Sequence, residues 1–133
     1  MPTLRAFIIE DNPVILESLV GALEEMSHVR VVGHASDEVS AVNWMRMHPV
    51  GEADLFIVDV FLLSGTGLGV LRAARELGMP AHCVVLTNYA TEDMRQRCLA
   101  LGAERVFDKS YQLDDLLSFC AELGGSDTRP AAL

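Results

Sequence analysis

Residues 5–13 of the chain read RAFIIEDNP and join a short strand pattern to the start of a helix. The run Arg5–Ile9 is rich in β-forming residues. Asn12 can cap a helix, and Pro13 suits the first helical position because the N–H that it lacks would have no partner there. Two acids, Glu10 and Asp11, stand where the strand pattern ends. The stretch therefore predicts the first half of a βα unit.

The same alternation of strand and helix patterns continues along the chain. Apolar residues three and four apart predict helices over about 13–26, 36–47, 68–77, 91–101 and 113–123. The β-rich runs between them predict further strands at Val29–Ala35, Leu55–Val58, Cys83–Leu86 and Arg105–Phe107. Five βα units in succession predict an α/β fold, a doubly wound parallel sheet of five strands with helices on both faces. We expect one domain over 1–125 and a disordered C-terminal tail over 126–133.

The composition narrows the classes of partner. The 133 residues contain 10 Lys and Arg against 19 Asp and Glu, a net charge of −9, which disfavours nucleic acids and anionic membranes. No apolar run reaches the roughly 18–20 residues of a membrane span, and the N-terminus lacks a signal-peptide layout. Three widely spaced cysteines without a CxxC pair, Cys83, Cys98 and Cys120, indicate buried reduced thiols. We therefore expect a cytoplasmic protein.

Polar residues with chemical potential stand at the ends of the predicted strands, where open parallel sheets bind ligands. Glu10 and Asp11 end the first strand and Asp59 the third, while Thr87 ends the fourth and Lys109, the only lysine, ends the fifth. Three crowded carboxylates repel one another, and a divalent cation such as Mg²⁺ offsets that repulsion. A carboxylate beside Mg²⁺ can accept a phosphoryl group, whose charge a metal, an ammonium and a hydroxyl can share.

With these residues, the chain resembles the response-regulator receiver domains of bacterial two-component signalling. The matching stretches span residues 5 to about 123 and are Ile8–Asn12, Ile57–Val60, Val84–Thr87, Gly102–Ala103 and Phe107–Ser110. The resemblance implies a flavodoxin-like fold with strand order 2-1-3-4-5. It also implies a receiver that a histidine kinase or a histidine phosphotransfer protein phosphorylates. Such a receiver, stand-alone or a fragment of a larger regulator, signals by protein–protein contact and is no enzyme beyond its own phosphotransfer and autodephosphorylation.

The resemblance implies a role for each acid. Asp59 would be the phospho-acceptor. Mg²⁺, or Mn²⁺ in its place, would be bound directly by Asp11 and Asp59. Glu10 would act through a metal-bound water, and the backbone carbonyl of Phe61 would be a further ligand.

The phosphoryl group and the partners would engage other positions. Lys109 and the Thr87 hydroxyl would bind the phosphoryl group, together with the backbone N–H groups of Val60 and Asn88. The kinase side would meet the first helix, where Val14 adds apolar surface. An output protein, or a second copy in a homodimer, would use the face formed by helix 91–101, strand 105–107 and helix 113–123. Charged candidates on that face are Arg95, Arg97, Arg105, Asp114 and Asp115.

Some positions depart from the commonest family pattern. Val106 stands where an aromatic residue usually swings inward on phosphorylation, and a short, stiff valine cannot make that movement, so the switch position is atypical. Ser110 replaces a proline that is often joined through a cis bond. A cis non-proline bond costs about 2.5–4 kcal/mol, which favours a trans bond here, but the sequence does not decide between the two. Leu63 replaces another proline.

Three side chains predict restricted access to the phosphoryl group. Asn88 replaces a small residue, Tyr89 follows it, and Phe61 lies two residues after Asp59. Together they would shield the phosphoryl group from water, so we expect slow autodephosphorylation.

Other functions fit these residues less well. A pseudo-receiver, a phosphorylation-independent protein-interaction module, is the alternative, and Val106 favours it slightly. An aspartyl-nucleophile phosphatase would need an acid in place of Phe61, and a flavodoxin would need a phosphate loop where Glu10 and Asp11 would repel the anion. The run Gly65-x-Gly67-x-Gly69 lacks the spacing of a dinucleotide loop and follows the wrong strand.

Overall fold

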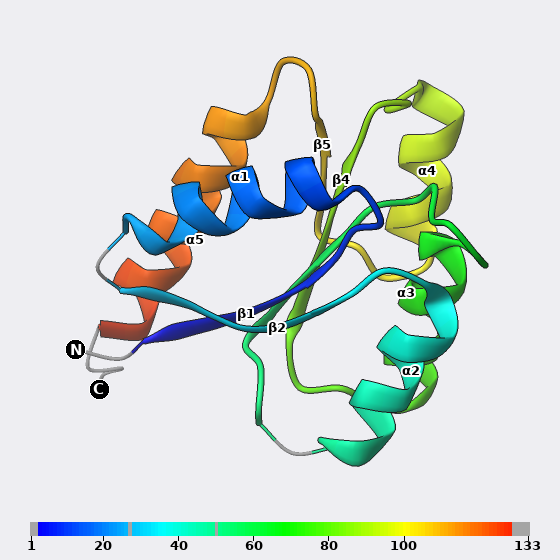
Figure 1. Ribbon diagram of the computed structural model, residues 1–133, viewed down its shortest axis with the longest axis horizontal. Helices are drawn as coiled ribbons and strands as arrows, with labels where there is room; N and C mark the ends of the chain where they lie inside the picture. The colour runs from blue at the N-terminus through cyan, green and yellow to red at the C-terminus, as the bar shows by residue number, and fades with distance from the viewer. Residues whose placement is uncertain (1–2, 27, 50, 129–133) are drawn as a thin grey trace.

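The computed structural model describes residues 3–26, 28–49 and 51–128 (Figure 1). Strands and helices alternate along the chain as the sequence predicts. The strands are β1 Leu4–Ile9, β2 Val29–Ala35, β3 Leu55–Val58, β4 His82–Thr87 and β5 Arg105–Asp108. The helices are α1 Pro13–Glu24, α2 Glu38–Met47, α3 Gly67–Glu76, α4 Glu92–Ala100 and α5 Leu113–Thr128. The predicted α/β class is confirmed.

The five strands form one parallel sheet in the order β2-β1-β3-β4-β5, which is the order that the resemblance implies. Helices α1 and α5 cover one face, and α2, α3 and α4 cover the other (Figure 1). Right-handed crossovers require this placement of helices on both faces of a doubly wound sheet. The carboxyl ends of β1, β3, β4 and β5 consequently meet along one edge.

Alternate residues of the central strands supply two separate cores. In β1, Phe7 and Ile9 pack toward α2, α3 and α4, whereas Ala6 and Ile8 pack toward α1 and α5. Strand β3 is likewise buried on both faces. Strands buried on both sides have near-continuous apolar sequences, which is why β3 is recognisable from four residues.

Capping side chains define the helix starts. The Asn12 side chain accepts hydrogen bonds from the backbone N–H groups of Val14 and Ile15, and Asp37, Thr66 and Thr91 cap α2, α3 and α4 in the same way. These bonds satisfy N–H groups that a helix leaves without partners in its first turn.

The end of α5 differs from the prediction. The sequence predicts a helix end near Leu123, before Gly124 and Gly125, but the helix continues to Thr128. Each residue added to an existing helix gains one hydrogen bond, which offsets the glycine cost of about 1 kcal/mol per residue. Residues 129–133 of the predicted tail lie outside the described residues. No helix in the described ranges is long and apolar enough to cross a membrane.

All three cysteines are free thiols. Cys98 and Cys120 are buried as predicted, whereas Cys83 is only partly buried because it lies near the start of β4. Burial raises the pKa of Cys83 to about 12 and that of Cys120 to about 11. These thiols therefore stay protonated at neutral pH, in keeping with reduced packing residues.

Candidate functional site

Three acids converge at the carboxyl edge of the sheet. Glu10 and Asp11 follow β1, Asp59 follows the neighbouring strand β3, and one carboxylate oxygen of each lies within 4.8 Å of the others. The Asp59 N–H donates to the Ile9 carbonyl at 3.0 Å, which extends the strand pairing up to the acid. Glu10 is 3% and Asp59 6% exposed, while Asp11 is half-buried. The structure therefore brings together the three acids that the sequence selects.

Lys109 lies between two of these acids. Its Nζ donates to Glu10 Oε1 at 2.6 Å and to Asp59 Oδ2 at 2.9 Å, and its backbone N–H donates to the Thr87 carbonyl. Burial by itself lowers the pKa of Lys109, but the hydrogen bonds and charges of Glu10 and Asp59 outweigh it and raise that pKa. Lys109 thus stays positively charged at neutral pH.

The pKa of Glu10 is raised in this arrangement. Burial raises the pKa of Glu10, and the hydrogen bonds from Lys109 and from the Asn12 N–H at 3.0 Å counter the rise only in part. Three carboxylates share one ammonium, so the cluster keeps an excess of negative charge. Carboxylate oxygens with excess negative charge are the ligands that a hard divalent cation prefers, and the donor set fits Mg²⁺.

A small cavity of about 160 Å³ opens beside the cluster. Phe61 and Tyr89 meet at this cavity edge to face, with ring centroids 5.0 Å apart and an interplanar angle of 74°. The Phe61 N–H donates to Asp59 Oδ1 at 3.2 Å. The lining residues are Glu10, Asp11, Asn12, Ile15, Asp59, Phe61, Asn88, Tyr89 and Lys109.

The sequence did not predict two of these lining residues. Asn12 and Ile15 had no predicted role at the site, although their place in the first turn after Asp11 was a usable signal. Thr87 is fully buried at the end of β4, and its hydroxyl accepts the Tyr89 N–H at 3.4 Å. Within the described ranges Thr87 is absent from the cavity wall.

The atypical switch position is tied to α4. Val106 is buried in β5, and its carbonyl accepts a hydrogen bond from the Arg95 guanidinium at 2.9 Å. The Lys109–Ser110 bond, which the sequence leaves open, is trans, since the part of the chain that the structure describes contains no cis peptide bond.

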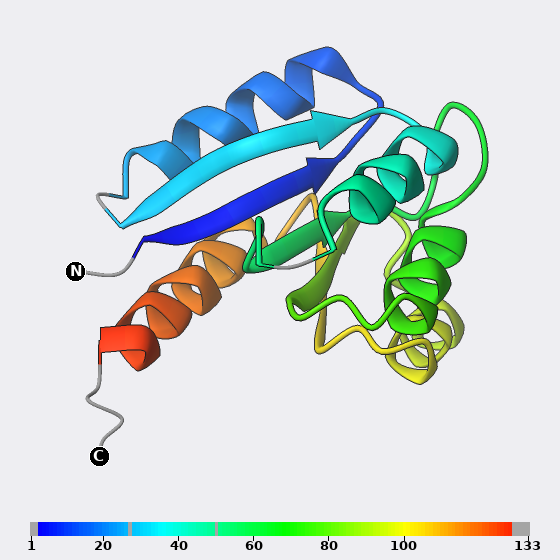
Figure 2. The ribbon, with the colours of Figure 1, turned by 90° about the horizontal axis from the view of Figure 1, so that it is seen from below.

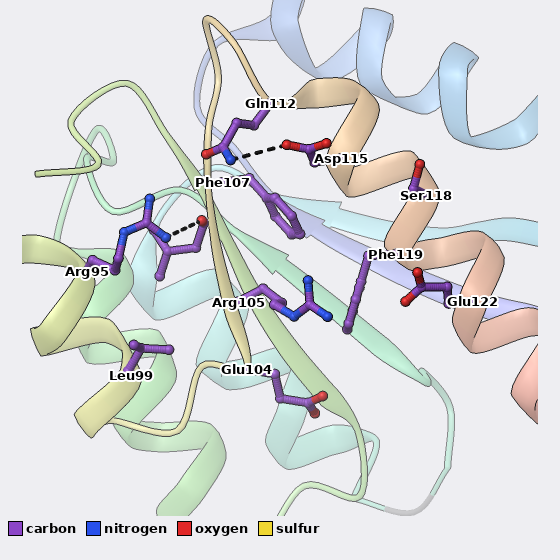
Figure 3. A pocket seen from close by; sticks show the side chains of 11 residues that line it. Arg95, Leu99, Glu104, Arg105, Phe107, Gln112, Asp115, Ser118, Phe119 and Glu122 are labelled. Carbon is purple, nitrogen blue, oxygen red and sulfur yellow. Dashed lines mark hydrogen bonds between the residues drawn. The ribbon is translucent and has the colours of Figure 1, made fainter. Parts of the chain in front are cut away.

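A second, larger groove of about 410 Å³ lies along α4, β5 and α5, on the predicted output face (Figure 3). Arg95, Arg105 and Asp115 line it, and the Arg105 guanidinium lies 5.0 Å over the Phe119 ring. Of the other two charged candidates, Arg97 instead pairs with Asp93 within α4 at 3.2 Å, and Asp114 is not part of the described lining.

Comparison with known proteins assigns the family. The family described as the response regulator receiver domain matches residues 6–121. The chain belongs to this family. The receiver domain is 25% identical over 133 residues to the transcriptional activator DevR/DosR of Mycobacterium tuberculosis, covering 97% of this chain and 60% of that protein. It is 31% identical over 115 residues to the transcriptional regulatory protein PdtaR of the same organism, covering 85% of this chain and 53% of that protein.

Solved structures show the same fold. The receiver domain of NarL from M. tuberculosis superposes with a TM-score of 0.83 at 21% identity, covering 94% of this chain and 98% of that one. RcsB of Salmonella, bound to a promoter with the phosphomimetic BeF₃⁻, gives a TM-score of 0.78 at 23% identity, covering 90% and 66%. The chain spans 60% or less of the length of the first curated relatives. It is thus a response-regulator receiver domain of bacterial two-component systems.

Proposed function

We propose that this receiver domain accepts a phosphoryl group on Asp59 in a Mg²⁺-dependent reaction with a histidine kinase or a histidine phosphotransfer protein. One observation carries the proposal. One carboxylate oxygen each of Glu10, Asp11 and Asp59 lies within 4.8 Å of the others, and the single lysine of the chain bridges Glu10 and Asp59. A cluster with this charge imbalance fits a cation and a phosphoryl anion together.

The residues divide the chemistry among them. Asp11, Asp59 and the Phe61 carbonyl would hold the cation, and Glu10 would hold it through a water. Bound Mg²⁺ supplies positive charge that offsets the acids and the phosphoryl oxygens. An Asp59 oxygen attacks phosphorus while the bond from phosphorus to the histidine nitrogen breaks, and the histidine leaves with those electrons.

Positive charge and N–H groups would then hold the product. The Lys109 ammonium, which already contacts Asp59, moves onto a phosphoryl oxygen. The backbone N–H groups of Val60 and Asn88 and the Thr87 hydroxyl provide further donors. To reach the phosphoryl group, the Thr87 hydroxyl must turn from its present place under the Tyr89 N–H.

The Phe61–Tyr89 pair would control water access. The two rings meet at the cavity, and Asn88 lines the same cavity. We expect slow autodephosphorylation. Tyr89→Ala should shorten the half-life of the phosphoprotein about tenfold, because it removes a side chain that excludes water from the phosphoryl group. Decay of the phosphoprotein, followed by intact mass after donor removal, measures this. A wild-type half-life of seconds, together with an equally long half-life for Tyr89→Ala, would contradict this role of the two rings.

The partners follow from the exposed surfaces. Val14 of α1 is 70% exposed and directly precedes Ile15, which lines the cavity, and the kinase side would contact Val14 there. The groove along α4, β5 and α5 is the proposed output surface, for an output protein or a second copy. The proposal also includes a cytoplasmic location and a domain over 1–125.

The decisive experiment measures the intact mass of the protein after incubation with acetyl phosphate or phosphoramidate and Mg²⁺. We expect one added phosphoryl group on the wild type and none on Asp59→Asn or without Mg²⁺. If small donors fail, a phosphotransfer protein is tried as donor. Failure of both donors would favour the pseudo-receiver, which the valine at the switch position, Val106, also favours slightly.

A further inference from the structure

Three glycines, Gly65, Gly67 and Gly69, stand at the end of the loop before α3 and in the first turn of α3, and the proposed chemistry does not explain them. A Cβ on Gly67 would overlap the Asp59 carbonyl oxygen and lie 2.8 Å from Val60 Cα. A Cβ on Gly65 would lie 2.6 Å from Glu38 Oε1, and one on Gly69 would lie 2.5 Å from the same atom. Gly67 therefore admits the backbone of the phospho-acceptor, whereas Gly65 and Gly69 make room for the Glu38 side chain.

Glu38 binds this loop at two points. It is the first residue of α2, and its N–H donates to the Ser64 carbonyl at 3.1 Å. Its Oε1 accepts the Thr66 N–H at 2.9 Å. Figure 2 shows the loop before α3 arching beside the start of α2. The side chain thus joins two segments 28 residues apart.

Short links connect Glu38 to the acid cluster. Thr66 pairs with Phe61 in an antiparallel bridge across the loop, and the Gly67 N–H donates to the Val60 carbonyl at 2.8 Å. Phe61 in turn donates its N–H to Asp59. From Glu38 to the phospho-acceptor, the connection therefore passes through two residues, Thr66 and Phe61.

Packing does not hold the outer part of this loop. Leu63 is 80% exposed, and Ser64, Gly65 and Thr66 are exposed as well. The restraints on this half of the loop are therefore hydrogen bonds: those to Glu38, the bridge between Thr66 and Phe61, and the Thr66 cap of α3. Groups that orient metal ligands in this way affect metal affinity without touching the metal.

We propose that Glu38 is a positioning residue for the cation site: by holding residues 64–66, it keeps the Phe61 backbone against Asp59. The inference rests on the proposed function, because Phe61 contributes a ligand only if Asp59 and its neighbours bind a cation. It adds to that function a residue from α2, on a different segment from every proposed ligand.

Glu38→Ala tests the clamp, with Mg²⁺ affinity measured by calorimetry on the unphosphorylated protein. We expect about tenfold weaker binding, the lower end of the range for groups that orient metal ligands. The Mg²⁺ concentration for half-maximal phosphorylation by acetyl phosphate should rise equally, while the rate at saturating Mg²⁺ is retained. Glu38→Gln keeps the acceptor oxygen and should retain most of the affinity.

Glu24→Ala is the matched control. The Glu24 carboxylate also accepts a backbone N–H, that of Val31 at 3.0 Å, but it links α1 to β2 instead of the loop. Its removal should leave Mg²⁺ affinity unchanged. Equal losses in both variants would show a general effect of destabilisation and would overturn the inference.

Gly69→Ala tests the same clamp without changing Glu38. Alanine has a higher helix propensity than glycine. If Gly69 has no part in placing Glu38, the variant should therefore be more stable and bind Mg²⁺ normally. Displacement of Glu38 by the new methyl predicts weaker Mg²⁺ binding instead, and no further loss when Glu38→Ala is added. Gly21→Ala is the control, because a Cβ on Gly21 meets nothing within 4 Å.

The outcomes separate the inference from the proposed function. Unchanged Mg²⁺ affinity in folded Glu38→Ala and Gly69→Ala would overturn the role of Glu38 while Asp59 is still phosphorylated. A folded wild type that binds no Mg²⁺ would overturn the proposed function, and the inference with it.

Discussion

The two edges of the sheet treat charge in opposite ways. At the amino edge, Asp54 and Glu104 each have a basic partner of their own. Asp54 accepts three hydrogen bonds from Arg5 at 2.8–3.0 Å, and Glu104 pairs with His82 at 2.6 Å. These side chains are 30–44% exposed, so water still solvates them.

At the carboxyl edge, three acids share one base. Glu10 and Asp59 bind the same Lys109 Nζ, and Asp11 lies beside them. The side chains of Glu10, Asp59 and Lys109 are 3–10% exposed. Burying unbalanced charge costs free energy that pairing within the protein does not recover.

The difference between these edges separates structure from function. Balanced, exposed pairs contribute modestly to stability and need nothing from outside. An unbalanced, buried cluster is stable only because the rest of the fold holds it, and a cation or a phosphoryl group can change its energy strongly. Perturbations at the carboxyl edge should therefore alter chemistry, and those at the amino edge only stability.

Lys109→Ala should have the largest effect. It removes the only base of the cluster, so phosphorylation of Asp59 should slow by about 10²–10³-fold, the usual cost of losing one donor to a developing anion. Mg²⁺ should bind more tightly, because no ammonium competes for Glu10 and Asp59. Rates from intact mass and Mg²⁺ titration by calorimetry check both. A parallel loss of metal binding would contradict the arrangement.

Mg²⁺ itself should stabilise the wild type. At ten times its Kd, the free energy of unfolding should rise by about 1.4 kcal/mol. Asp11→Asn should lose most of this gain. In the absence of Mg²⁺, however, the variant should be about 1 kcal/mol more stable than the wild type, because two like charges near 4 Å repel by about that much in water. Urea titrations with and without Mg²⁺ measure both changes, and Asp54→Asn should keep the full Mg²⁺ response.

Asp54→Asn should cost about 1 kcal/mol of stability at pH 7 and leave phosphorylation unchanged. Burial alone raises the pKa of Asp54, but the hydrogen bonds and charge of Arg5 outweigh it and lower that pKa below its usual 3.8. A carboxyl with a lowered pKa stabilises the fold above 3.8 and loses that contribution as the pH falls through its folded pKa. The difference between variant and wild type should therefore shrink as the pH falls below 3.8 and vanish below the folded pKa of Asp54, as measured by urea unfolding at several pH values.

The smallest effect belongs to His82→Gln. Its partner Glu104 is 44% exposed, and exposed pairs of this kind contribute less than about 1 kcal/mol. Thermal unfolding near neutral pH should detect a change close to its error, with Mg²⁺ binding unaltered. A large loss would mean that the amino edge is less balanced than its geometry indicates.

The predictable part of the molecule follows from local patterns. All five strands are within one residue of their predicted bounds at each end, and β2 and β3 match at both ends, because apolar period and β-branched content act over a few residues. Helix α5 is the main miss, since its extension past Gly124 and Gly125 depends on a helix already formed.

The candidate site was predictable for a related reason. Parallel strands place their carboxyl ends at one edge, so Glu10, Asp11, Asp59 and Lys109 could be grouped from strand ends alone. The function of Glu38 could not be predicted in this way. Nothing near it in the chain marks it, and its partners Ser64 and Thr66 lie on a loop far along the sequence.

The sequence by itself determined the order of the elements, the residue type at each strand end and the family, because these depend on neighbours along the chain. Only the tertiary structure decided which groups share a charge or a hydrogen bond. Lys109 between Glu10 and Asp59, and Arg95 on the Val106 carbonyl, arise from the packing of separate elements. Hydrogen bonds and ion pairs act over about 3 Å, and only the folded chain sets distances of that size between segments far apart in sequence.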